Sequence, residues 1–333
     1  MSDTDAQEQI EDLSGSYSVI DYRLRPAKHA ERAMLVETAM RLRFGDLKSY
    51  RYVGFGAIYF SDFKVFHKNL GITDLHNIEG REVDKKRFIW NKPYSNIKMH
   101  FGMSSAVIPN MSWRKKSIVW LDYDGQLNGS KLKDIDFLIR NAASGSLLLF
   151  SVNAEKPSPV GISREDREKD LAAALKLLVG ADRVKSSIKD QDLRGKFAAG
   201  VYYQIISDAI ESAVSVFNRV ADSEGVRRVW KQIIHITYKD GAQMLTVGGV
   251  IFEAKDEKCF STGQFEKLSF YRPSSDSFAI NVPKLTLKEM TLLEKSALLG
   301  PDRCSGLSFL KAREWKDYLK LVRYLPSYVS ADL

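Results

Sequence analysis

The sequence contains little cysteine and no long apolar run. Its two cysteines, Cys259 and Cys304, lie far apart, and neither has another cysteine or a histidine nearby at metal-binding spacing. We therefore predict two reduced thiols, not a disulfide framework or a zinc site. No apolar stretch approaches the roughly 20 residues that cross a bilayer, and the acidic N-terminus lacks the basic start and apolar stretch of a signal peptide. These absences predict a cytoplasmic protein without a membrane partner.

Common hydrolase motifs are also missing. The sequence contains no Gly-x-Ser-x-Gly, His-Glu-x-x-His or P-loop pattern, and no internal repeat or low-complexity tract. This argues against the hydrolase classes that depend on those motifs. With 44% hydrophobic and 28% charged residues, the composition is that of an ordinary globular protein.

The net charge of +8 is spread along the 333 residues in small clusters. These clusters lie at residues 23–32, 85–87, 114–116 and 227–231. A solvated basic surface would explain them, and a nucleic-acid or phosphorylated partner is the alternative.

The first basic cluster lies on a predicted helix that begins near Pro26, where the missing N–H of proline is tolerated. Arg25, Lys28 and Arg32 are three and four residues apart, so they share one side of the first turns. We interpret them either as a surface basic stripe or as candidate substrate-binding residues leading into the core domain.

The chain divides into four predicted parts. These are a disordered acidic tail (1–20), an N-terminal helical segment (21–48), an α/β core domain (49–255) and a C-terminal helical subdomain (256–333). Within the core domain, short apolar runs separated by helical segments predict a parallel sheet with helices on both faces. The runs are 50–53, 75–78, 97–101, 117–121 and 146–152.

A hairpin follows the parallel strands. Asp240-Gly241 lies between two β-rich runs, 232–238 and 243–252, and this dipeptide is a strong hairpin signal. A plain dinucleotide-binding dehydrogenase is not expected to end its sheet on a hairpin, so an oxidoreductase is the weaker interpretation.

The first strand leads into a glycine turn, Gly54-Phe55-Gly56. The run Ser61–Leu70 that follows is predicted to be a helix, with Gly71 placed to end it. A strand, a glycine turn and a helix are the parts of a nucleotide-type ligand site, because glycine lets the backbone approach a ligand closely.

Polar residues at the ends of later strands strengthen this interpretation. Ligands of open α/β sheets bind outside the carboxyl ends of the strands, where Glu79, Asp122 and Asn153 are expected. A carboxylate at Glu79 can accept both hydroxyls of a ribose. Asp122, Asp124 and Asn153 form an alternative magnesium site, and the run Asp122–Gly125 has a simpler interpretation as a turn after a strand.

The strand order, the glycine turn, the strand-end acids and the final hairpin resemble the class I S-adenosylmethionine-dependent methyltransferase fold, which is Rossmann-like. More narrowly, the segments YRYVGFGAIYFSDF, LGITDLHNIE, WNKPY and IVWLDYDG are similar to a family of bacterial proteins labelled "putative O-methyltransferase". The resemblance covers nearly the whole chain from about Tyr22. It implies S-adenosylmethionine as cofactor and a small-molecule or macromolecular methyl acceptor that the sequence does not identify.

The resemblance also implies roles for individual residues. Gly54, Phe55 and Gly56 would line the methionine and ribose parts of the cofactor, and Glu79 would hold the ribose hydroxyls. Gly102 and Met103 would lie near the adenine. Asp122 would stand beside the methyl donor. Methyl transfer needs alignment of donor and acceptor, plus a base when the acceptor is a hydroxyl. Asp122 and Asp124 are the candidate catalytic residues, as base or as binders of an amine, and no metal is required.

Two positions depart from the usual glycine loop of this superfamily. An acidic residue commonly precedes the first glycine by two positions, where this chain has Tyr52, and a third glycine is commonly found where it has Ile58. Asp62 is a candidate to supply the missing carboxylate. These departures support an alternative function, a catalytically inactive methyltransferase-like binding or regulatory protein. Such a protein would contact nucleic acid in bacterial defence, with a winged-helix-like C-terminal segment.

Overall fold

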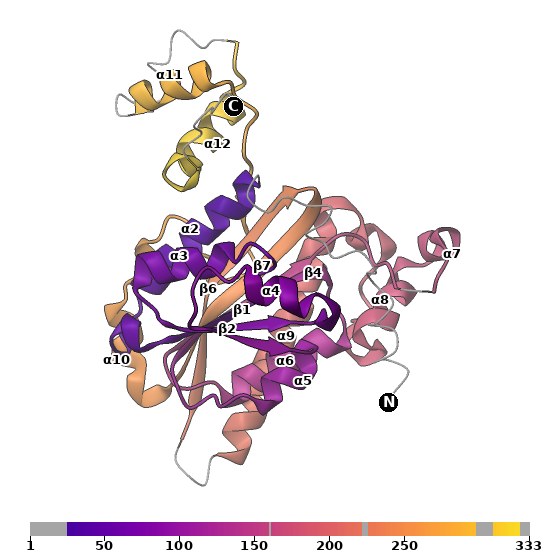
Figure 1. Cartoon of the computed structure of the whole chain (residues 1–333). Coiled ribbons are helices and arrows are strands. Elements are labelled where there is room, and N and C mark those ends of the chain that lie inside the picture. Colours follow the sequence, from indigo (N-terminus) through magenta and orange to yellow (C-terminus); the bar gives the residue numbers. More distant parts are fainter. Residues whose placement is uncertain (1–24, 160, 222–225, 298–308, 327–333) are drawn as a thin grey trace.

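The computed structural model describes residues 25–159, 161–221, 226–297 and 309–326 (Figure 1). The predicted acidic tail and Cys304 lie outside the described residues. The described chain forms one eight-stranded sheet in the order β3-β2-β1-β4-β5-β7-β6-β8. The strands are β1 (Arg51–Gly54), β2 (Asp74–Glu79), β3 (Ile97–Phe101), β4 (Ser117–Gln126), β5 (Ser146–Asn153), β6 (Arg228–Asp240), β7 (Ala242–Glu253) and β8 (Phe278–Ile280).

Strands β1 to β5 are parallel, and β7 is antiparallel to both of its neighbours, β5 and β6. Strand β6 therefore runs in the same direction as β1 to β5. This arrangement confirms the predicted Rossmann-like α/β sheet that ends in an antiparallel hairpin. The turn of the hairpin is at Gly241, whose φ of +107° favours glycine.

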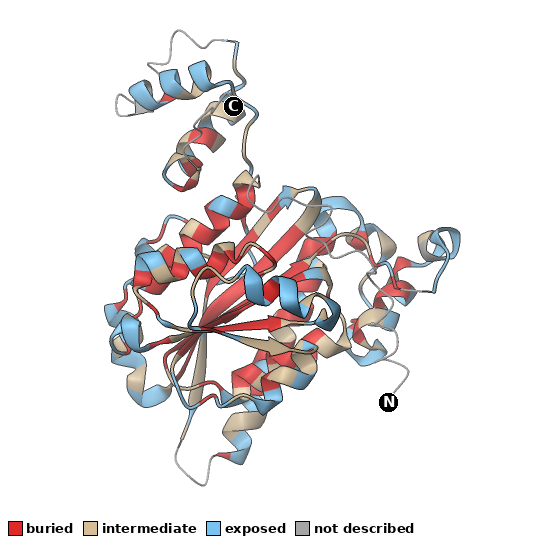
Figure 2. Ribbon diagram, in the orientation of Figure 1, coloured by how far each residue is buried: buried red, intermediate tan, exposed pale blue. Residues whose placement is uncertain are grey.

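Helices cover both faces of the sheet (Figures 1 and 2). One face packs against α2 (Pro26–Met40), α3 (Ser61–Leu70), α4 (Lys85–Trp90) and α10 (Glu257–Thr262). The other face packs against α5 (Ser104–Asn110), α6 (Gly129–Asn141), α8 (Leu171–Val179) and α9 (Ala198–Val220), with the short α7 (Arg164–Lys169) before α8. Helix α3 has the predicted bounds, and Gly71 ends it with a φ of +68°. Across the described residues, no helix is both long and apolar enough to span a membrane.

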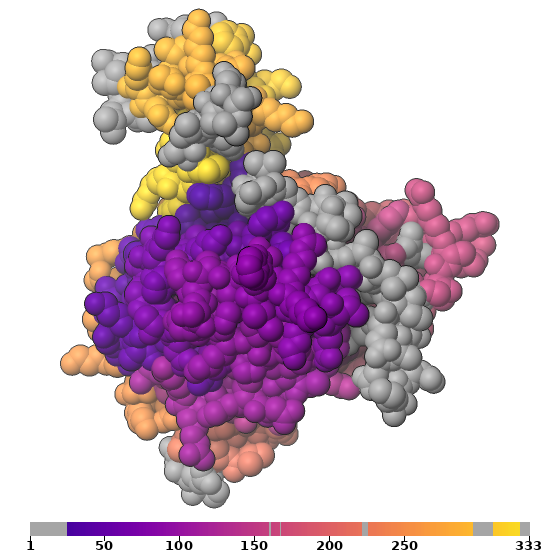
Figure 3. Space-filling view, viewed as in Figure 1, coloured from indigo at the N-terminus to yellow at the C-terminus, as the bar shows by residue number. Residues whose placement is uncertain are grey.

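The C-terminal helices α11 (Leu287–Ala297) and α12 (Ala312–Leu321) form a small unit that projects from the sheet domain (Figures 1 and 3). Leu293 and Tyr318 are its buried centre. The Tyr324 hydroxyl, just beyond α12, donates a 2.7 Å hydrogen bond to Glu37 of α2 and joins the unit to the sheet domain. The described residues after Ile280 are helical or irregular, so they contain no β-wing of a winged-helix unit.

Candidate functional site

The carboxyl ends of β1, β2 and β4 lie side by side at one edge of the sheet, and we call the site there the crevice. The glycine turn after β1 is held tightly against β2. The Gly56 amide donates a 2.5 Å hydrogen bond to Asn77 Oδ1. A Cβ on Gly56 would lie 2.8 Å from that oxygen and 2.8 Å from the rings of Phe60 and Phe63. Only glycine fits here, because real Cβ atoms do not approach neighbours so closely.

The rest of this loop is shaped by apolar packing. Ile58, where a third glycine is common, is buried in the core. The left-handed conformations fall instead on Ala57 and Phe60, with φ of 42° and 49°. The Phe60 amide closes the turn with a 2.8 Å hydrogen bond to the Gly56 carbonyl. The loop therefore keeps a defined shape without the third glycine.

Glu79 lies at the end of β2, as predicted. Its Oε1 accepts a 2.8 Å hydrogen bond from the Arg81 amide. Burial raises the pKa of its carboxyl to about 7. The negative charges of Asp84 and Asp124 also raise this pKa, whereas Arg81 lowers it. The Gly102 amide bonds to the Glu79 carbonyl at 2.9 Å, and Met103 follows. The structure thus brings Glu79 and Gly102 together and places Asp124 near enough to influence the Glu79 charge.

A group of buried and half-buried charged residues, which we call the ion cluster, lies beside the ends of β1 and β4. Lys28, Glu31 and Arg32 come from α2, Asp62 comes from α3 and Asp122 comes from β4. Lys28 Nζ lies 2.5 Å from Asp122 Oδ1 and 2.9 Å from Glu31 Oε2, and Arg32 pairs with Asp62. Lys28 is only 1% exposed and Arg32 only 7%. The interpretation of these two residues as a surface stripe is therefore wrong.

Lys28 is held as a buried cation. Burial alone would lower the pKa of its ammonium group, but the carboxylates of Asp122 and Glu31 outweigh burial and raise this pKa. The ammonium also lies 4.3 Å from the centre of the Trp120 ring, a favourable cation–π distance. Lys28 therefore stays charged in the folded protein.

Polar side chains that were not predicted from the sequence extend the ion cluster into the sheet. Thr246 of β7 donates a hydrogen bond to Glu31, Thr246 and Ser151 of β5 are 2.7 Å apart, and Trp120 Nε1 donates to Ser151 at 2.9 Å. The available signal was a polar residue inside an apolar strand, as at Ser151 in SLLLFSVN. The N-terminal helix is thereby bonded to the central strands.

The alternative interpretation of Asp122–Gly125 as a turn is wrong, because β4 continues through Gln126. Asp122 belongs to the ion cluster, while the Asp124 side chain is exposed at the rim of the crevice. Asn153 accepts a hydrogen bond from the Glu155 amide at 2.9 Å. Within the parts of the chain that the structure describes, no group of three or more His, Cys, Asp or Glu side chains is arranged to hold a metal ion.

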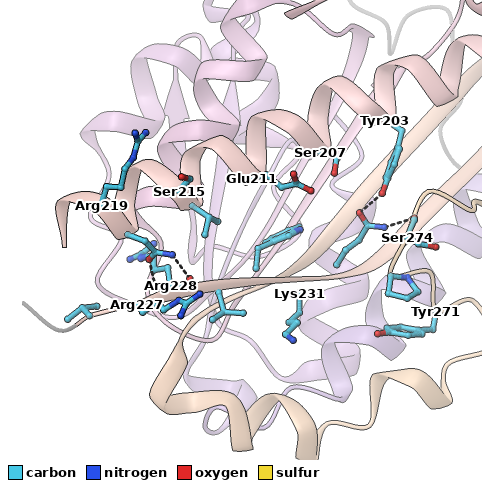
Figure 4. Close-up of a pocket in the computed structure, with 17 residues that line it drawn as sticks. Tyr203, Ser207, Glu211, Ser215, Arg219, Arg227, Arg228, Lys231, Tyr271 and Ser274 are labelled. Atoms are coloured by element: carbon cyan, nitrogen blue, oxygen red, sulfur yellow. Dashed lines mark hydrogen bonds between the residues drawn. The ribbon is translucent and has the colours of Figure 1, made fainter. Parts of the chain in front are cut away.

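A large cavity lies elsewhere, between α9 and β6 (Figure 4). Its volume is about 1190 Å³, and its wall includes the basic cluster Arg227–Lys231. These residues begin β6, whereas Asp240, at the far end of the same strand, accepts a 3.0 Å hydrogen bond from the Lys28 amide. Lys231, the last residue of the cluster, and Asp240 are nine residues apart along the strand, a span of about 30 Å. The cavity is therefore not part of the crevice.

A family model described as "Putative O-methyltransferase" matches residues 20–333. The chain belongs to this family. No curated protein matches the sequence.

The solved structures to which the chain is similar share little sequence with it. An O-methyltransferase from Bacillus cereus in complex with SAH is 11% identical, with 74% of this chain and 90% of that chain covered and a TM-score of 0.35. An arsenic(III) S-adenosylmethionine methyltransferase from Chlamydomonas reinhardtii is 10% identical, with 64% and 66% covered and a TM-score of 0.36. The Methanococcus jannaschii fibrillarin pre-rRNA processing protein is 8% identical, with 63% and 70% covered and a TM-score of 0.34.

The crevice has a donor set that fits S-adenosylmethionine. Glu79 offers a carboxyl group that can accept hydrogen bonds from hydroxyl groups, and the three carboxylates of the ion cluster exceed its two cations, which suits a sulfonium and an amino group. The buried Tyr52 hydroxyl has no hydrogen-bond partner in the described part of the chain. Burial, with the charges of Asp62 and Asp122, raises its pKa well above the usual value, so it remains a neutral donor.

Proposed function

We propose that the protein is an S-adenosylmethionine-dependent methyltransferase that binds its cofactor across the ends of β1, β2 and β4. In this proposal Gly54, Phe55 and Gly56 line the methionine and ribose, Glu79 accepts the ribose hydroxyls, and Gly102 and Met103 flank the adenine. The observation that carries the proposal is the half-buried Glu79 carboxyl at the end of β2, beside a tightly held glycine turn. Such a carboxyl is costly to bury without a ligand that uses it.

The two candidate catalytic aspartates have different surroundings and take different roles. Asp122 is bonded to the Lys28 ammonium, so we assign it the positioning of Lys28 beside the methyl donor. Asp124 is exposed at the rim, and we assign it the acceptor, as base for a hydroxyl or binder of an amine. Arg25, partly exposed at the start of α2, is the candidate for direct contact with the acceptor. Lys28 and Arg32 are buried and support the site through their ion pairs with Asp122 and Asp62.

The direct test is calorimetric titration of the purified protein with S-adenosylmethionine and with S-adenosylhomocysteine. We expect both to bind with one site per chain. Asp124→Asn should not weaken the affinity for S-adenosylhomocysteine, since the residue is assigned to the acceptor and its charge only adds to the raised pKa of Glu79. Absence of binding of both compounds at millimolar concentration would contradict the proposal.

Glu79 predicts a specific pH dependence of cofactor binding. A carboxylate accepts ribose hydroxyls better than a carboxylic acid does, and the pKa of about 7 means that the ionised form dominates only above pH 7. Affinity for S-adenosylhomocysteine should therefore rise about tenfold between pH 6 and pH 8. Titrations at constant ionic strength measure this. The Glu79→Gln variant should bind S-adenosylhomocysteine more weakly and without the pH dependence. If the affinity of the wild type is constant or falls between pH 6 and pH 8, the assignment of Glu79 to the ribose is refuted.

A catalytically inactive binding protein is the second candidate. It is favoured by Tyr52 in place of the usual acid and by the ammonium of Lys28 already bonded to Asp122. The result that would distinguish it from the enzyme is a protein that binds S-adenosylmethionine but neither hydrolyses it slowly nor methylates any acceptor offered. For both candidates we propose a cytoplasmic location and count nucleic acid among the partners, a class that the net charge of +8 favours.

A further inference from the structure

Helix α4, which follows β2, exposes an unusual set of side chains. Phe88 is its buried residue, whereas Trp90 is 88% exposed and Val83, in the turn before the helix, is 86% exposed. Tryptophan is on average largely buried, so one this exposed is informative. The basic residues Lys85, Lys86 and Arg87 of the same helix are exposed as well.

The exposed residues form an ordered stripe. Lys86 and Trp90 are four residues apart, which places them on one side of α4, and Val83 lies three residues before Lys86 in the 3-10 turn Glu82–Asp84 that leads into the helix. Phe88 lies two residues from both Lys86 and Trp90, so it faces the opposite side and anchors the helix. We call Val83, Lys86, Arg87 and Trp90 the α4 stripe. It combines an aromatic surface with positive charge on a fixed support.

The α4 stripe lies at the rim of the crevice. The Phe88 ring contacts that of Phe60, with 6.4 Å between centroids, and Phe60 ends the glycine loop after β1. The Lys85 ammonium lies 5.2 Å from the ring of Phe101, the residue before Gly102. Two contacts therefore hold α4 beside the proposed ribose and adenine positions, and the α4 stripe lies on the side of this helix opposite Phe88.

We propose that the α4 stripe binds a single-stranded nucleic acid, with Trp90 stacked on an unpaired base and Lys86 and Arg87 against the phosphates. Base stacking on an exposed aromatic ring and cations along the backbone are the two components of single-strand binding. An anionic membrane surface is less suitable, because Ile89 and Trp90 of this six-residue helix, with Val83 before it, offer little exposed apolar area. The inference rests on the proposed function in one respect: the bound strand is then the methyl acceptor.

The test measures binding of a fluorescein-labelled 12-nucleotide uridine RNA by anisotropy at 50 mM salt. Trp90→Ala should weaken binding about 5- to 100-fold. The double variant Lys86→Ala/Arg87→Ala should lower the slope of log affinity against log salt concentration by about 1.4. The matched control Lys133→Ala/Lys176→Ala removes two exposed charges from helices α6 and α8, on the other face of the sheet, and should leave affinity nearly unchanged.

The outcomes separate this inference from the proposed function. S-adenosylhomocysteine binding without RNA binding would overturn the α4 proposal and leave the methyltransferase proposal intact. RNA binding without cofactor binding would support the stripe and contradict the enzyme. Trp90-dependent binding to vesicles of phosphatidylserine and phosphatidylcholine, with none to RNA, would assign the stripe to a membrane and overturn the proposal. Because Trp90 is so exposed, Trp90→Ala should keep the wild-type melting temperature.

Discussion

Replacing Lys28 by methionine should reduce the free energy of unfolding by about 3–5 kcal/mol. The substitution keeps the volume of the side chain and removes its charge. Asp122 and Glu31, which lie 2.5 Å and 2.9 Å from the ammonium, would then be buried without their cation. Urea denaturation of the wild type and the variant at pH 7.5 measures the difference.

Two further variants show whether the loss comes from the charge. Lys64→Met, at an exposed position of α3, should change stability by less than about 0.5 kcal/mol. Lys28→Met/Asp122→Asn removes one carboxylate together with the cation, so it should be more stable than Lys28→Met alone. The deficit of Lys28→Met should also shrink as the pH falls toward 5, because an unpaired carboxylate takes up a proton more readily. A double variant no better than the single one would show that packing, not charge, explains the loss.

Local signals in the sequence predicted much of the fold. Gly71 ends α3 and Asp240-Gly241 turns the last hairpin, because both positions need conformations that the side chains of most residues resist. The five parallel strands were recognisable as short apolar runs, since strands covered on both faces carry few polar residues. Strand β8, of three residues, was missed, because it is too short to show a period and depends on its pairing with Ile236–Tyr238 of β6.

The ion cluster was only partly predictable. Lys28 and Arg32 were identified as candidates, but their charge suggested exposure, and their partners Asp62 and Asp122 are 30 and 94 residues away. A usable signal was present in α2, where Lys28 and Glu31 share a helical side with the buried Leu35. Charged residues on an apolar side of a helix require partners, which only the tertiary structure identifies. The same limit applies to Tyr52, because nothing local shows that its hydroxyl is buried within the electrostatic influence of Asp62 and Asp122.

Gly56→Ala should both destabilise the protein and weaken cofactor binding. The added methyl group would lie 2.8 Å from Asn77 Oδ1 and from two phenylalanine rings, all of them buried. Overpacking of this kind costs about 1–3 kcal/mol. Relief requires the glycine loop to move away from β2, so we expect affinity for S-adenosylhomocysteine to fall at least about tenfold. Thermal unfolding and calorimetric titration measure the two effects separately.

A matched glycine and a double-mutant cycle make this prediction specific. Gly200 of α9 has no atom within 4 Å of its Cβ position, so Gly200→Ala should be neutral or stabilise the helix by up to about 1 kcal/mol. Asn77→Ala removes the acceptor of the Gly56 amide and, with it, one of the atoms that the new methyl group would strike. The losses of Gly56→Ala and Asn77→Ala should therefore add to more than the loss of the double variant. If the losses of the two single variants simply add up to the loss of the double variant, contact with Asn77 does not position the loop. The close fit of the glycine turn against β2 would then no longer explain the requirement for glycine.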